Sequence, residues 1–91
     1  MAHTVREKTK LLNRVRRIRG QMEAVERALE GEKGCAAVLQ LIAGVRGAIN
    51  GLMAEVVEDH ILFHVADGDL AQEQRKEGAA ELIDVVRAYL K

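Results

Sequence analysis

The sequence predicts an all-α fold, a three-helix protomer that pairs with copies of itself. Apolar residues make up 48% of the 91 residues but aromatic residues only 2%, and the chain contains no proline. A core of Leu, Val, Ile and Ala, with no helix-breaking proline, is typical of helix bundles. We expect residues 1–91 to form a single domain, which is too small to bury a large core alone, so partner subunits are also expected.

The first helix is expected to begin at Thr4. Thr4 and Glu7 have the spacing of a capping box, in which the hydroxyl and the carboxylate satisfy free backbone donors of the first turn. Apolar residues then alternate spacings of four and three, which indicates a seam for packing against another helix. The seam residues are Leu11, Val15, Ile18, Met22, Val25 and Leu29. Gly31 and Gly34 are expected to end the helix and turn the chain.

The second helix is expected to run from near Cys35 to about His64. A broad apolar stripe lies on the same side as Cys35, His60 and His64, and Arg46 falls on that side too, where we expect a polar gap near a dimer axis. The stripe consists of Val38, Ile42, Val45, Ile49, Leu52, Met53 and Val56. Small residues occupy the opposite side, where the first helix is expected to approach closely: Gly44, Gly47, Ala48 and Gly51.

A third helix is expected after a break at Gly68, with Asp69 as its cap. Its apolar residues recur at helical spacing and predict one buried face. That face consists of Ala79, Leu82, Ile83, Val86 and Leu90.

The spacing of one cysteine and two histidines suggests a metal site. His60 and His64 lie one turn apart on one helix face, and Cys35 falls within roughly 40° of them around a continuous helix. Along the axis, however, Cys35 and His60 would be about 37 Å apart. Two copies that run antiparallel would bring Cys35 of one copy to His60 and His64 of the other, twice over. The sequence therefore suggests a site split across an antiparallel four-helix-bundle dimer.

The alternative is that Cys35 is a loop thiol and that the histidines only end a helix. If Met1 is removed, the Ala2 amino group and the His3 imidazole could chelate the same ion. Thiolate is a soft ligand and imidazole a borderline one, which suits a late first-row divalent ion. One thiolate per site disfavours copper(I), so nickel or cobalt is expected, with zinc as a competitor.

The net charge is zero but unevenly distributed. Residues 1–20 hold seven Lys and Arg against one acid, whereas residues 21–91 hold seven against thirteen. A solvated basic face is one interpretation, but this asymmetry favours a bound polyanion. With no interleaved aromatics and no helix-turn-helix, contacts to double-stranded DNA phosphates and DNA shape are the expected mode. The candidate DNA-binding residues are Lys10, Arg14, Arg16, Arg17 and Arg19.

Several stretches across the chain carry a resemblance to a known family: Arg14–Gln21, Cys35 with Val38–Gln40, Arg46–Ala48, Asn50–Met53, His60 and the ending Arg87–Lys91. On these residues the chain resembles the CsoR/RcnR family of bacterial transcriptional repressors over essentially its whole length. The resemblance implies a helical dimer that pairs into a tetramer and binds operator DNA without a known DNA-binding motif. It also implies that an effector releases the operator and turns on a detoxifying or efflux gene.

The effector residues are similar to those of the nickel- and cobalt-sensing RcnR/DmeR branch, which implies a ligand set of the Ala2 amino group, His3, Cys35, His60 and His64. Copper sensors of the family carry cysteine where this chain has His64. The formaldehyde-sensing FrmR branch shares Cys35 and His60, and its framework is similar, but there an N-terminal proline takes part where this chain has Ala2. We therefore expect a repressor that nickel or cobalt releases from its operator; a formaldehyde-responsive repressor is the alternative.

An enzyme and an architectural DNA-binding protein are the alternatives from other classes of function. An enzyme is disfavoured because no free Glu or Asp accompanies the ligands at general-base spacing. A purely architectural DNA-binding protein would bind DNA indifferently to metal, whereas a sensor couples the two. A single cysteine, with no signal peptide and no long apolar run, predicts a cytoplasmic protein without a membrane partner.

Overall fold

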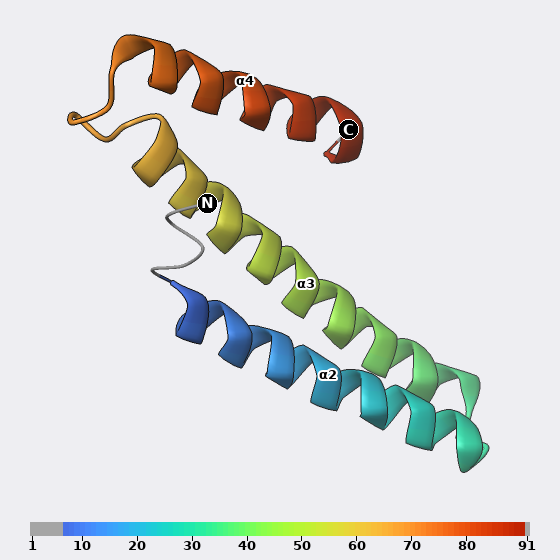
Figure 1. The fold of residues 1–91 in the computed structure, drawn as a ribbon. Helices are drawn as coiled ribbons and strands as arrows, with labels where there is room; N and C mark the ends of the chain where they lie inside the picture. Colours follow the sequence, from blue (N-terminus) through green and yellow to red (C-terminus); the bar gives the residue numbers. More distant parts are fainter. Residues whose placement is uncertain (1–6, 91) are drawn as a thin grey trace. The chain divides into compact units, whose positions relative to one another are not determined.

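The computed structural model describes residues 7–90, which form three helices: α2 (Lys8–Glu30), α3 (Cys35–His64) and α4 (Gln72–Tyr89) (Figure 1). No strand occurs within this range, and the predicted three-helix, all-α protomer is confirmed. The chain divides into two compact units. The hairpin unit spans residues 7–53 and the C-terminal unit contains residues 54–90, so that α3 contributes to both.

Helix α2 begins at Lys8, three residues later than the capping box predicted. Glu7 is itself the N-cap residue, with φ −98° and ψ 13°, and no side chain caps the helix. The Glu7 carboxylate lies 4.0 Å from the Lys10 ammonium instead. The predicted place of Glu7 inside the first turn is therefore wrong, and Thr4 lies outside the described residues.

The turn between α2 and α3 depends on a residue other than glycine. Gly31 is the C-cap of α2, as predicted, but its φ is −84°, and the left-handed residue is Glu32 with φ 54°. The Lys33 N–H donates to the Ala28 carbonyl at 2.9 Å. This is the pattern of a Schellman cap, in which glycine usually takes the left-handed position. Neither Gly31 nor Gly34 has a positive φ, so the glycines do not make the turn in the expected way.

In the hairpin unit, α2 packs against one face of α3. The side chains that form the core are Val25 and Ala28 of α2, each 6% exposed, and Val45 of α3, 5% exposed. The neighbouring α3 residues on this face are half-buried at spacings of three, four and seven, as expected for a helix–helix seam. They are Val38, Ala48 and Leu52.

A second apolar seam of α3 is left exposed, so the broad predicted stripe is divided between two faces. Leu39 is 57% exposed, Ile42 and Ile49 are each 46% exposed, and Met53 is 38% exposed. Three α2 residues spaced seven apart are exposed as well: Val15 (43%), Met22 (49%) and Leu29 (61%). The hairpin unit thus buries one part of its apolar surface in its own core and leaves another part exposed.

The small residues of α3 do not form the groove for α2 that the sequence predicted. A Cβ atom added at Gly44 or Gly47 would meet nothing within 4 Å, so no backbone approaches these positions. At Gly51 an added Cβ would lie 3.2 Å from Nη1 of Arg14. The prediction is therefore wrong for Gly44 and Gly47, because α2 packs on the apolar seam, where more surface is removed from water.

In the C-terminal unit, α3 ends at His64 as predicted, and the Ile61 carbonyl accepts the N–H groups of Val65 and Ala66 at 3.1 and 2.8 Å. Gly68 lies in the turn that follows, also as predicted.

Asp69 does not cap α4, contrary to the prediction. The N-cap residue is Ala71, whose N–H donates to Oε1 of Gln74 at 2.8 Å. The Asp69 N–H instead donates to Oδ1 of Asp67 at 2.9 Å, which shapes the turn before the helix. The carboxylate that organises this turn is therefore that of Asp67.

The predicted buried face of α4 is at most half-buried, and only at Ala79 and Leu82. Gly78 is buried, and Ala79 and Leu82 are half-buried. The later members of the predicted face are exposed: Ile83 (50%), Val86 (43%) and Leu90 (44%). The prediction is wrong for these three residues within one chain, because the contact of α4 is centred on a glycine near its start.

By length and composition alone, α3 could also cross a membrane, since its mean hydropathy reaches 1.4. This corrects the expectation that the chain has no long apolar run. One such helix is weak evidence, because the core helix of a soluble protein passes the same test. Arg46 lies within α3, and an arginine at the centre of a bilayer costs about 2.5–3.5 kcal/mol.

The left-handed conformation of Glu32 predicts that glycine is better tolerated there. A Glu32→Gly variant should raise the free energy of unfolding by about 1 kcal/mol, because a side chain in this conformation is strained. Chemical denaturation at a fixed protein concentration would measure the change. Glu26→Gly, in the exposed middle of α2, is the control and should lower stability by about 1 kcal/mol. If Glu32→Gly lowered stability as much as Glu26→Gly, the backbone at Glu32 would not be strained.

Candidate functional site

The last turn of α3 holds two histidine side chains next to each other. His60 and His64 are one helical turn apart, their ring centroids are 5.0 Å apart, and their planes are inclined by 35°. Both side chains are half-buried. The sequence prediction that they share one helix face is confirmed; whether they bind a metal stays a prediction.

A hydrogen bond to α4 fixes the His60 ring. Nε2 of His60 lies 2.7 Å from the carbonyl oxygen of Gly78. Because a carbonyl oxygen only accepts, Nε2 must carry the proton in this contact, and in the neutral ring the lone pair is then on Nδ1. Histidines that bind metals commonly donate their other ring N–H to a backbone carbonyl in this way. In a metal site, Nδ1 would therefore be the ligating atom of His60.

Burial lowers the pKa of His64 below its usual value, and the neighbouring His60 ring lowers it further. The Glu81 carboxylate acts in the opposite direction. A lowered pKa favours the neutral imidazole near neutral pH, and the neutral ring is the form that can coordinate a metal. The electrostatic setting of His64 thus fits a ligand.

An open space borders the His60 ring within the C-terminal unit. This cavity of about 270 Å³ is otherwise lined by apolar side chains of α3 and α4 and by one carboxylate. The lining residues are Val56, Val57, His60, Glu81, Leu82 and Val85. A ligand or a partner side chain can therefore reach His60 from this side.

Cys35 is the first residue of α3, and its thiol is free and exposed. Within residues 7–90, no group of three or more Cys, His, Asp or Glu side chains could hold a metal ion. Because α3 is continuous over 30 residues, one copy keeps Cys35 and His64 at opposite ends of the helix. The Ala2 amino group and His3, the other predicted ligands, lie outside the described residues.

The exposed seam of α3 lies on the helix face that carries Cys35. At 100° per residue, Leu39, Ile42, Ile49 and Met53 share this face with Cys35. Arg46, which is also exposed, interrupts the seam between Ile42 and Ile49. An exposed apolar helix face of this length marks an interaction surface. The interruption by Arg46 is where the sequence analysis predicted a polar gap.

The candidate DNA-binding residues on α2 fall into two groups. Lys10, Arg16, Arg17 and Arg19 are exposed, and Arg16 donates to Oδ1 of Asn13 at 3.4 Å. Arg14 is half-buried, and its guanidinium lies over Gly51 of α3. Four of the five bases can reach a polyanion directly, whereas Arg14 is also part of the α2–α3 contact.

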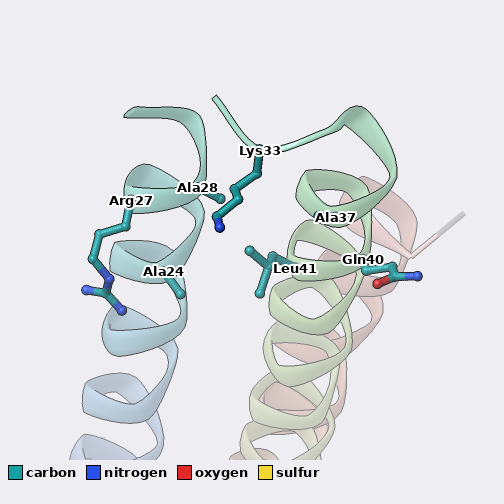
Figure 2. A pocket seen from close by; sticks show the side chains of 7 residues that line it. All are labelled: Ala24, Arg27, Ala28, Lys33, Ala37, Gln40 and Leu41. Atoms are coloured by element: carbon teal, nitrogen blue, oxygen red, sulfur yellow. The ribbon is translucent and has the colours of Figure 1, made fainter. Parts of the chain in front are cut away.

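A larger cavity of about 550 Å³ lies in the hairpin unit near the turn (Figure 2). Figure 2 shows Lys33 reaching into the space between the two helices, whereas Gln40 points away from it. Its lining holds no His, Cys or carboxylate and consists of Ala24, Arg27, Ala28, Lys33, Ala37, Gln40 and Leu41. This cavity does not offer the chemistry of a metal site.

Sequence reasoning missed the part that α4 plays. Gly78 is an interior helix glycine, which costs roughly 1 kcal/mol against alanine, and this cost was the available signal of a close contact. Asp59, next to His60, was also missed. It is only 7% exposed, and its Oδ2 atom makes no hydrogen bond among the described side chains. Burial of a carboxylate in an apolar helix leaves no pattern in the sequence.

Comparison with known proteins finds relatives along the whole chain. The model of a family described as metal-sensitive transcriptional repressor matches residues 7–88. A protein of Serratia marcescens, described as an uncharacterized protein in the bioA 5′ region, is 55% identical over 91 residues, which is all of both chains. The transcriptional repressor RcnR of Salmonella arizonae is 44% identical over 92 residues, again all of both chains.

A solved structure is similar as well. It is a variant of the formaldehyde-responsive regulator FrmR from Salmonella enterica serovar Typhimurium, with one glutamate replaced by histidine. The identity is 52% and the TM-score 0.83, over 92% of this chain and 94% of that chain. This similarity supports the helical fold described above.

Proposed function

The chain belongs to the family of metal-sensitive transcriptional repressors, and we propose that it binds operator DNA in its apo form and leaves it when nickel or cobalt binds, which derepresses an efflux gene. The resemblance to the CsoR/RcnR family is thereby confirmed. Members of the family are transcriptional repressors and not enzymes, so the prediction that the chain is not an enzyme is confirmed too.

The observation that carries the proposal is the placement of ligands on α3. An exposed thiol begins the helix, and two adjacent imidazoles end it. Two copies of α3 that pair antiparallel bring each Cys35 to the His60 and His64 of the other copy. Each dimer then holds two equivalent sites, as two-fold symmetry requires.

The exposed apolar seams support this pairing. The seams of α2 and α3 together give the hairpin unit an apolar face, and two such faces packed together make a four-helix bundle. Pairing of α3 near its middle would place Arg46 close to the two-fold axis, which fits a polar gap there. Dimers would pair further into a tetramer, and the exposed end of α4 offers additional apolar surface. Packing of α3 against a second copy would also explain why this helix is so apolar, without insertion into a membrane.

The donor set fits a late first-row divalent ion. Cys35 would supply a thiolate, and His60 and His64 would supply imidazole nitrogens, with the Ala2 amino group and His3 completing the set. A single thiolate with several nitrogen ligands suits nickel or cobalt, and zinc would compete. The ion would supply the binding energy that selects the DNA-free state of the repressor.

The DNA-binding surface would lie on α2. Lys10, Arg16, Arg17 and Arg19 are exposed there, and Arg14 would join them from its place over Gly51. Contacts of these cations with phosphates would position the repressor on double-stranded operator DNA. A repressor of this family acts in the bacterial cytoplasm, which agrees with the single reduced cysteine.

A formaldehyde-responsive repressor is the second candidate, and one observation favours it. The similar solved protein is named for its response to formaldehyde. That protein is a variant in which a glutamate is changed to histidine, whereas this chain carries histidine at position 64 in its own sequence. Cys35 could react with an aldehyde, but Ala2 stands where that chemistry uses proline. We place nickel and cobalt first because the second imidazole has no use in aldehyde chemistry.

The split site predicts complementation between defective chains. Cys35→Ala and His60→Ala should each lose tight cobalt binding when tested alone, because each removes a ligand from both sites of a dimer. After subunit exchange, the heterodimer should regain one intact site, and its other site should be doubly defective. Titration with cobalt, followed by the thiolate charge-transfer band, measures the stoichiometry.

The control for complementation is exchange between two differently tagged Cys35→Ala chains, which should restore nothing. Native mass spectrometry confirms that subunits have exchanged. Confirmed heterodimers with no regained cobalt site would contradict the split-site arrangement.

The basic surface predicts a change in the salt dependence of DNA binding. Arg17→Ala should weaken operator binding and reduce the slope of log affinity against log salt by about one, because one phosphate contact is lost. Arg14→Ala should do the same. Arg27→Ala removes the same charge from α2 outside residues 1–20 and should leave the slope unchanged. Fluorescence anisotropy at several salt concentrations measures all three; equal slopes would place the DNA surface elsewhere.

His64 separates the two effectors. His64→Ala should abolish nickel- or cobalt-driven release from DNA and leave any response to formaldehyde intact, because only the metal site needs the second imidazole. His64→Glu should do the same. Release in the wild type should also fade below about pH 6, as protons compete for the imidazoles. If formaldehyde released the wild-type protein from DNA and neither nickel nor cobalt did, formaldehyde would be the effector instead.

A further inference from the structure

The contact between α4 and α3 in the C-terminal unit depends on the absence of a side chain. A Cβ atom added to Gly78 would overlap the carbonyl oxygen of His64 and lie 3.0 Å from the His64 Cβ. Backbone atoms cannot move aside as the end of a flexible side chain can. Gly78 is buried in the interior of α4, so its cost in helix stability is offset by a close approach that no other residue permits.

The same residue holds the other histidine of the pair. Its carbonyl oxygen accepts the Nε2 proton of His60 at 2.7 Å. Gly78 thus contacts both imidazole-bearing residues, one through the backbone of His64 and one through the ring of His60.

We infer that Gly78 is a positioning residue for the effector site: it docks α4 on the last turn of α3, holds His60 as the Nε2–H tautomer, and thereby directs Nδ1 toward the effector. The inference deepens the proposed metal response and rests on it for its functional meaning. Gly78 itself touches no effector, because its carbonyl is bonded to the far side of the ring.

The arrangement couples α4 to occupancy of the site. If Nδ1 of His60 held a cation, Nε2–H would be a stronger donor to the Gly78 carbonyl. Binding would therefore tighten the docking of α4, and by linkage the docked α4 would raise the affinity for the cation by the same factor. The hydrogen bond at Gly78 is therefore the contact through which a ligand on His60 would affect the packing of α4.

The first test uses the apo protein, so that it does not depend on any effector. Nitrogen-15 NMR of the histidine rings should find wild-type His60 as the Nε2–H tautomer, with slow exchange of that proton. Gly78→Ala should abolish this preference and speed amide exchange in α4 by up to about tenfold, as expected for the loss of one hydrogen bond and its packing. Gly68→Ala is the matched control, because an added Cβ there meets nothing within 4 Å.

The second test adds cobalt to the same variants. Gly78→Ala should bind cobalt about 10- to 100-fold more weakly, the usual effect of losing a partner of a metal-bound histidine. Its apo affinity for operator DNA should stay unchanged, because the basic residues lie on α2. In the wild type, cobalt should slow amide exchange in α4, and in Gly78→Ala it should not.

His60→Ala keeps the test decisive if Gly78→Ala fails to fold. This variant leaves Gly78 in place, and it should still speed exchange of the α4 amides around Gly78 while leaving α2 unchanged. An Nδ1–H tautomer in the wild type, or unchanged α4 exchange in His60→Ala, would overturn the inference. The expected tautomer and exchange in a protein that binds neither nickel nor cobalt would instead refute the proposed metal response and keep the positioning role.

Discussion

The continuity of α3 is the constraint on which the other features of this protein depend. Nothing between Cys35 and His64 interrupts the helix, so its rigid backbone keeps the thiol and the imidazoles at opposite ends. A turn anywhere in this segment would let one chain fold its ligands together and bind a metal as a monomer. Because the helix is unbroken, the ligand set that we propose requires a second copy, and the exposed seam between the two ends offers a surface for it. Effector binding and oligomerisation are then a single linked equilibrium in the proposed function.

At the end of α3, the chemistry of the histidines is set by their surroundings. Desolvation keeps the pKa of His64 low, which favours its neutral form. The Gly78 carbonyl fixes which nitrogen of His60 carries its proton. The first effect favours the form of His64 that can donate a lone pair, and the second comes from the packing of α4 against His60.

The family of this chain is described as metal-sensitive, yet one similar solved protein is named for its response to formaldehyde. The chain is 44% identical to the repressor RcnR and 52% identical to the variant of FrmR, so overall similarity does not separate a metal response from an aldehyde response. The distinction depends on side chains at the site. An imidazole at position 64 adds a borderline donor to the set, whereas a carboxylate would add a hard one and a negative charge. In the proposed function, the identity of the effector therefore depends on a few side chains at the site.

The sequence by itself determined the three helices, the end points of α3 and the shared face of His60 and His64, because these follow from local periodicity and from the absence of proline. It also located the basic surface of α2, since charge is a property of the residues alone. Only the tertiary structure decided which half of the α3 stripe packs on α2, that Glu32 rather than a glycine turns the chain, and that Asp69 does not cap α4. The contact of Gly78 with both histidines likewise emerged only from the fold, because it joins residues of different helices whose approach no local pattern encodes. Which faces of two helices pack together depends on how much apolar surface the whole chain buries, and not on the local sequence of either helix.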